Sequence, residues 1–104
     1  MMRLWIDDVR PPPDEYWHWA KTSKEALDVL GCDVQEISFD HDLGGNDTAM
    51  PVALEIELRA FLGKPIPPVW HVHSANPVGR RNLENALRKA EFFRSENIKT
   101  GEPQ

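Results

Sequence analysis

The sequence predicts a small α/β protein in which helices pack on a mostly parallel sheet of about four strands. Short apolar or aromatic segments alternate with helical segments in the order β, β, α, β, α, β, α, which is typical of this class. Polar clusters follow three of the strands directly, as expected where parallel strands end at one edge of a sheet. The length of 104 residues fits a single domain.

The expected strands are short segments rich in apolar, aromatic or β-branched residues. They span residues 3–6, 16–20, 34–39 and 69–74. The first stops at the pair Asp7-Asp8 and the third stops at Asp40, so both carry acids at their carboxyl ends.

Three helices are expected from their end signals, over residues 24–30, 51–62 and 77–93. Thr22 offers an N-cap to the first helix and Gly31 ends it. Pro51 suits the first turn of the second helix, and Gly63 ends it. Asn76 can cap the third helix. We expect one domain over residues 1–94 and a polar, frayed tail over residues 95–104.

The connection between the first two strands is proline-rich and too short for a helix. Residues 10–14 read RPPPD, and proline has no amide proton to donate to a helix or a central strand. An extended arm at ~3.1 Å per residue is long enough to return the chain and keep the two strands parallel. The alternative is a hairpin with an antiparallel second strand.

Composition limits the classes of function. The formal charge of −5 argues against a long nucleic-acid groove but not against one small nucleotide, and it would attract a metal ion. Cys32 is the single cysteine, so no internal disulfide can form, which favours a reducing compartment. There is no apolar run of membrane-spanning length, and the expected location is the cytoplasm. The sequence does not indicate an oligomeric state.

Three polar clusters are expected at one edge of the sheet. They are Asp7-Asp8, Asp40-His41-Asp42 and residues 71–74, which read HVHS. Ligands of open parallel sheets bind beyond the carboxyl ends of the strands. Four carboxylates that lie close together repel one another, and a divalent cation with a preference for oxygen, Mg²⁺ or Mn²⁺, would compensate them. The sequence therefore predicts a metal site at Asp7, Asp8, Asp40 and Asp42.

A phosphate-bearing ligand is the simplest occupant beside such a metal. The expected phosphate contacts combine glycine amides, polar side chains and cations, and they are Arg10, Gly44, Gly45, Ser74, Asn76 and Arg80.

The candidates for chemistry are Asp40, His41 and His73. His41 lies within the acidic cluster, which suits a general acid. His73, near the strand end, is favoured over His71 for proton transfer or phosphate contact. The alternative for His71 is a structural role.

The same residues resemble response-regulator receiver domains, in which Asp8 and Asp40 would help to hold magnesium and Asp40 would accept a phosphoryl group. The usual first helix is replaced by the proline arm, and no fifth strand ends in a lysine. Three motifs together more closely resemble the cyclic-phosphate processing receiver domains: LWIDDVRP at residues 4–11, ISFDHDLG at residues 37–44 and VHSANPVGR at residues 72–80.

That resemblance implies a metal-assisted phosphoesterase that acts on cyclic phosphates of RNA ends or nucleotides, in RNA repair or phage conflict. Its setting would be a bacterial cytosol or the cytosol of a phage-infected host. One alternative is a non-catalytic module that binds a cyclic nucleotide or is regulated by phosphorylation of Asp40. Another, ranked lower, interprets FDHD at residues 39–42 as the aspartate pair of haloacid-dehalogenase-like phosphatases.

Overall fold

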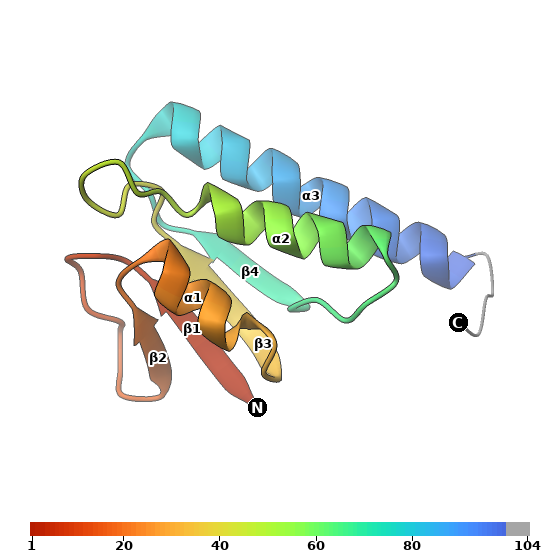
Figure 1. Cartoon of the computed structure of the whole chain (residues 1–104), viewed down its shortest axis with the longest axis horizontal. Helices are drawn as coiled ribbons and strands as arrows, with labels where there is room; N and C mark the ends of the chain where they lie inside the picture. Colours follow the sequence, from red (N-terminus) through yellow and green to blue (C-terminus); the bar gives the residue numbers. More distant parts are fainter. Residues whose placement is uncertain (100–104) are drawn as a thin grey trace.

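The computed structural model describes residues 1–99 and contains one four-stranded sheet and three helices (Figure 1). In chain order the elements are β1 (Met2–Ile6), β2 (Trp17–Ala20), α1 (Ser23–Leu30), β3 (Val34–Phe39), α2 (Met50–Phe61), β4 (Val69–Val72) and α3 (Pro77–Lys99). The predicted order of elements and α/β class are confirmed. The last helix runs beyond the expected end at residue 93, and residues 100–104 of the expected tail lie outside the described residues.

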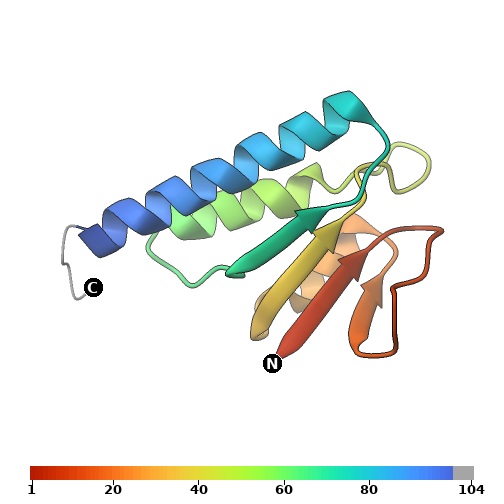
Figure 2. The ribbon, with the colours of Figure 1, turned by 180° about the vertical axis from the view of Figure 1, so that it is seen from behind.

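The four strands are all parallel and lie in the order β2-β1-β3-β4. Because β1 and β2 pair in parallel, the connector returns the chain as an extended arm, and the hairpin alternative is wrong. In both ribbon views this arm passes on the outer side of β2 (Figures 1 and 2). Within residues 1–99 there is no helix between β1 and β2 and no strand after β4.

The hydrophobic core lies between one face of the sheet and the helices. Its largest fully buried side chains come from β1, β3, α2 and α3, and they are Leu4, Ile6, Ile37, Phe39, Val52, Ile56, Leu83 and Leu87. Burial of such side chains contributes roughly 1.5–3 kcal/mol each before chain entropy is subtracted. This packing fixes the strand ends that carry the site. Among the described residues, no helix is both long and apolar enough to cross a membrane.

The other face of the sheet has no helix over it (Figure 2). We call it the open face. The pairing register places two rows of side chains across it, Trp17, Arg3, Glu36 and Val69 in one row and Trp19, Trp5, Ser38 and His71 in the next. Trp5 is nevertheless only 8% exposed, because neighbouring side chains of the same face cover it.

Candidate functional site

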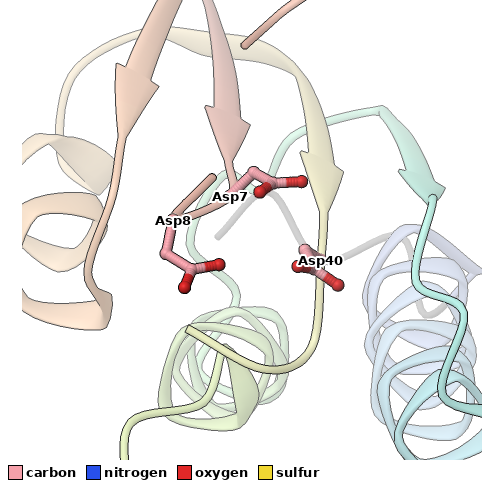
Figure 3. Close-up of side chains that lie close together, drawn as sticks. All are labelled: Asp7, Asp8 and Asp40. Atoms are coloured by element: carbon pink, nitrogen blue, oxygen red, sulfur yellow. The ribbon is translucent and has the colours of Figure 1, made fainter. Parts of the chain in front are cut away.

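Three carboxylates meet at the carboxyl ends of β1 and β3. Asp7 and Asp8 follow β1 and Asp40 follows β3, and one oxygen from each lies within 4.8 Å of the others (Figure 3). β1 and β3 are hydrogen-bonded neighbours, so the parallel register brings the two acidic clusters together. The expected convergence of these three residues is therefore present in the structure.

Asp7 is fixed by the protein on almost every side. Its Oδ1 accepts hydrogen bonds from the backbone amides of Val9, at 2.9 Å, and Arg10, at 2.7 Å. Its Oδ2 lies 3.0 Å from Nε2 of His73, and the side chain is 4% exposed. A carboxylate has about four acceptor positions, so Asp7 keeps about one for a ligand.

His73 lies behind Asp7 in a chain of hydrogen bonds. Its Nδ1 is 2.7 Å from Oγ of Ser38, and its ring stacks on Trp5 with a centroid distance of 4.1 Å and 6° between the planes. Burial lowers the pKa of His73, although the hydrogen bond and charge of Asp7 act in the opposite direction. We therefore assign the neutral tautomer that donates from Nε2 to Asp7 and accepts from the Ser38 hydroxyl.

Asp40 is held in an environment that disfavours its charge. Burial raises the pKa of Asp40, and the negative charge of Asp7 raises it further. Hydrogen bonds from the His41 backbone and the Ser74 hydroxyl lower the pKa of Asp40 only in part. This is the electrostatic condition that a bound cation relieves.

Asp8 faces the glycine turn that follows β3. A Cβ atom on Gly44 would lie 3.3 Å from Oδ2 of Asp8, and Gly44 has a φ of +89°, which only glycine adopts readily. Gly45 also has a positive φ, +56°. Within residues 1–99 no protein acceptor is found for the amides of Gly44 and Gly45. Both amides therefore remain able to donate to a ligand.

The family model for the cyclic-phosphate processing receiver domain matches residues 2–89, which include every residue of this site. The chain belongs to that family. A search of curated proteins and a search of solved structures gave no match.

His41 of this receiver domain lies against the first turn of α3. A Cβ atom on Gly79 would lie 2.3 Å from Cγ of His41, so the imidazole rests directly on the glycine backbone. Nδ1 of His41 is 3.0 Å from Oδ1 of Asp42, and no protein partner is found for its Nε2 in the described part of the chain. The ring is thus oriented with one nitrogen unpartnered.

Asp42 does not join the other carboxylates, contrary to expectation. Its two oxygens contact His41 and Nδ2 of Asn76, and the side chain is 63% exposed. Hydrogen bonds from His41 and then Asn76 lower the pKa of Asp42. β3 ends at Phe39, as expected, and the chain bends before Asp42.

Two expected phosphate ligands are used to begin α3. Oδ1 of Asn76 accepts from the amides of Val78 and Gly79, both at 3.1 Å, so Asn76 is the helix cap. Oγ of Ser74 accepts from the amide of Asn76 at 3.1 Å, and Ser74 is 6% exposed. Their polar atoms are therefore mainly occupied within the protein.

The two expected arginines differ in how they are placed. Nε of Arg80 is paired with Glu84 at 3.2 Å, one turn further along α3. Arg10 is exposed, and its side chain has no ion-pair partner among residues 1–99. Of the two, Arg10 is the one available to an anion.

Sequence reasoning missed the side chains that hold the site from the open face. Nε1 of Trp5 donates to the Arg10 carbonyl at 2.8 Å, and Nε1 of Trp19 donates to the Asp7 carbonyl at 2.7 Å. The signal that could have identified these two tryptophans is that the N–H group of a buried indole needs a hydrogen-bond acceptor. The role of Gly79 was also missed. The signal for it was a glycine inside an expected helix, which often marks a place where another group packs closely against the backbone.

Proposed function

We propose that this receiver domain is a metal-dependent phosphoesterase that processes cyclic phosphates on nucleotides or RNA ends. One observation carries the proposal: oxygens of Asp7, Asp8 and Asp40 lie within 4.8 Å of one another, in a chain whose family is named for cyclic-phosphate processing. The proposed setting is RNA repair or phage conflict in the cytoplasm.

The donor set fits a divalent cation with a preference for oxygen. Asp8 and Asp40 are half-buried, and Asp7 retains about one acceptor position. Carboxylate oxygens suit Mg²⁺ or Mn²⁺. The raised pKa of Asp40 supports the same assignment, because a cation would offset the repulsion from Asp7. When bound, such an ion polarises a phosphoryl oxygen and offsets charge in a displacement at phosphorus.

Hydrolysis of a cyclic phosphate also requires proton transfer. A bond forms between a water oxygen and phosphorus, one bond between phosphorus and a ribose oxygen breaks, and a proton passes from the water to that ribose oxygen. His41 is our candidate for this transfer, because its Nε2 has no partner within residues 1–99 and Asp42 orients the ring through Nδ1. His73, with both nitrogens engaged, positions Asp7 instead.

The amides of Gly44 and Gly45 and the side chain of Arg10 are the proposed contacts of the phosphate. Glycine turns present amides to anions without steric hindrance from a side chain. Arg10 has no competing ion pair among the described residues. Asp40 acts in this scheme as a metal ligand. In the alternative in which Asp40 is the nucleophile, its carboxylate oxygen bonds to phosphorus as the bond to the ribose oxygen breaks and that oxygen takes a proton, and water then hydrolyses the acyl phosphate.

A second candidate function is a non-catalytic module that binds a cyclic nucleotide or carries a phosphoryl group on Asp40. It is favoured by the position of Asp40, which is more exposed than Asp7 and lies where receivers are phosphorylated.

The test is a chromatographic assay of 2′,3′-cyclic nucleotides with native protein. We expect a phosphomonoester product that requires Mg²⁺ or Mn²⁺, disappears with a chelator and returns when the metal is restored. The Asp40→Asn variant should give no product, whereas Asp33→Asn, at an exposed residue before β3, should behave as the native protein. A product that forms equally well with the chelator would contradict metal dependence.

A further inference from the structure

The β1–β2 half of the open face carries exposed aromatic surface next to the three carboxylates. Trp17 and Trp19 of the edge strand β2 are half-buried, although no helix lies over them (Figure 2). Trp5 packs edge-on against Trp17 with ring centroids 5.7 Å apart. The indole of Trp19 is tied to the site, because its Nε1 donates to the Asp7 carbonyl at 2.7 Å. Aromatic surface therefore continues directly from the carboxylates across the sheet.

Cations accompany these rings. Nζ of Lys21 lies 4.4 Å from the centre of the Trp19 ring, and the guanidinium of Arg3 lies 5.8 Å from that of Trp17. Neither Lys21 nor Arg10 has an ion-pair partner among residues 1–99, although Glu25 accepts from the Lys21 amide. Lys21 follows Ala20, whose carbonyl accepts from the Asp7 amide, so Lys21 and Asp7 lie at the same level of the sheet.

The β3–β4 half of the same face is different in charge. Glu36 lies there, paired with Arg3 at 3.3 Å and with His71 at 2.8 Å, and Val69 completes its row. An anionic chain that leaves the carboxylates would therefore meet the acid Glu36 over β3, but the unpaired cations Lys21 and Arg10 beyond the ends of β2 and β1. Single-stranded nucleic acid is held by this combination of stacking rings and nearby cations.

We propose that the β1–β2 half of the open face binds the single-stranded RNA that precedes the terminal phosphate. Bases stack on Trp19 and Trp17, and the backbone phosphate that precedes the terminal phosphate pairs with Lys21. The inference rests on the proposed function in one respect, namely that the terminal phosphate lies at the three carboxylates. The formal charge of −5 and the small aromatic surface limit the footprint to a few nucleotides.

The test measures binding rather than turnover. Fluorescein-labelled oligoadenylates of increasing length, each ending in a 3′-phosphate monoester, are titrated with native protein in Mg²⁺ and followed by anisotropy. We expect Kd to fall about tenfold when one or two nucleotides precede the terminal one, and then to level off. Lys21→Ala should remove part of this gain in affinity with oligomer length. It should also reduce the slope of log Kd against log salt concentration by about 0.7.

The matched control is Lys24→Ala, at an exposed lysine of α1 that is paired with Asp28 at 3.1 Å, and it should bind as the native protein does. Trp17→Leu should lose the gain with length but keep the binding of the single nucleotide, and its circular dichroism spectrum verifies the fold. Lys21 is exposed, so Lys21→Ala keeps the test valid if Trp17→Leu does not fold.

Equal Kd values at every oligomer length would overturn the inference. So would a gain in affinity with length that Lys21→Ala leaves unchanged, or a failure of every oligomer to bind. Loss of the proposed phosphoesterase activity is a separate result, because these oligomers are already monoesters. Length-dependent binding without turnover of cyclic phosphates would support the RNA surface and contradict the enzyme.

Discussion

The imidazole of His73 lies flat against the indole of Trp5, with ring centroids 4.1 Å apart and 6° between the planes. Trp5 is on β1, whereas His73 directly follows β4, and β3 lies between these two strands. This stacking directs Nε2 of His73 to Asp7 at 3.0 Å while Ser38 contacts the other ring nitrogen. The position of Asp7 is thus set from the open face of the sheet and from its own turn.

Removal of His73 should therefore weaken metal binding. Partners that orient metal ligands typically contribute 10- to 100-fold in affinity or activity, so we expect His73→Ala to raise the Kd for Mn²⁺ by about that factor. His71→Ala is the control, since His71 lies two residues earlier, is exposed and contacts Glu36. Calorimetric titration with Mn²⁺ measures both. An unchanged Kd in His73→Ala would show that Asp7 does not depend on it.

Asp40 should lower the stability of the metal-free protein at neutral pH. The pKa of Asp40 is raised above its ordinary value of 3.8, so the folded state holds the proton more tightly than the unfolded state. Stability is then highest below the unfolded pKa and falls as pH rises through the folded pKa. We expect metal-free Asp40→Asn to have a higher Tm than the native protein near pH 7 and a difference that vanishes below about pH 3.5.

Added metal should reverse that order. At about a hundredfold excess over Kd, Mg²⁺ or Mn²⁺ should stabilise the native protein by about 2.7 kcal/mol and leave Asp40→Asn nearly unchanged. Thermal unfolding with and without metal measures both effects. A native protein whose Tm is insensitive to metal would contradict the metal site.

The two glycines after β3 provide a matched pair of substitutions. Gly44→Ala and Gly45→Ala both place a side chain at a positive φ, which costs about 1–2 kcal/mol of stability. Only Gly44→Ala also brings a Cβ atom to 3.3 Å from Asp8, whereas nothing lies within 4 Å of a Cβ on Gly45. We expect similar losses of stability and a weaker Mn²⁺ affinity in Gly44→Ala alone. Equal affinities would show that Asp8 is not held by this close contact.

Gly79→Ala should impair catalysis more than folding. Alanine favours a helix over glycine by about 1 kcal/mol, but its Cβ would lie 2.3 Å from the His41 ring and force the ring to move. We expect kcat to fall by at least about tenfold, as for loss of a general acid or base, with little change in KM. Gly31→Ala, where nothing lies within 4 Å, is the control. Native kcat in Gly79→Ala would exclude His41 from proton transfer.

Local signals in the sequence were sufficient for the fold. The Asp7-Asp8 and Asp40 clusters end apolar runs, so the mostly parallel sheet and the carboxylate group could be predicted. The direction of β2 could not, because the proline arm permits an extended return but does not exclude a hairpin. The end of α3 was missed because polar residues such as Glu96 and Asn97 continue a helix as readily as a tail.

The roles of individual side chains at the site could be predicted less well from the sequence. Whether Asp42 joins Asp40 depends in part on its contact with Asn76, which lies 34 residues further along the chain. The same holds for His73, whose partner Asp7 lies at the other end of the chain. Strand spacing places such residues on a face, but only the packed structure selects their partners.

The most direct test of the account is phosphorus NMR of the native protein with a 2′,3′-cyclic nucleotide and Mg²⁺ or Mn²⁺, compared with Asp40→Asn. The account predicts that the cyclic-phosphate signal is replaced by a phosphomonoester signal with the native protein and persists with the variant. A cyclic-phosphate signal that persists with both proteins, or disappears equally fast with both, would contradict it.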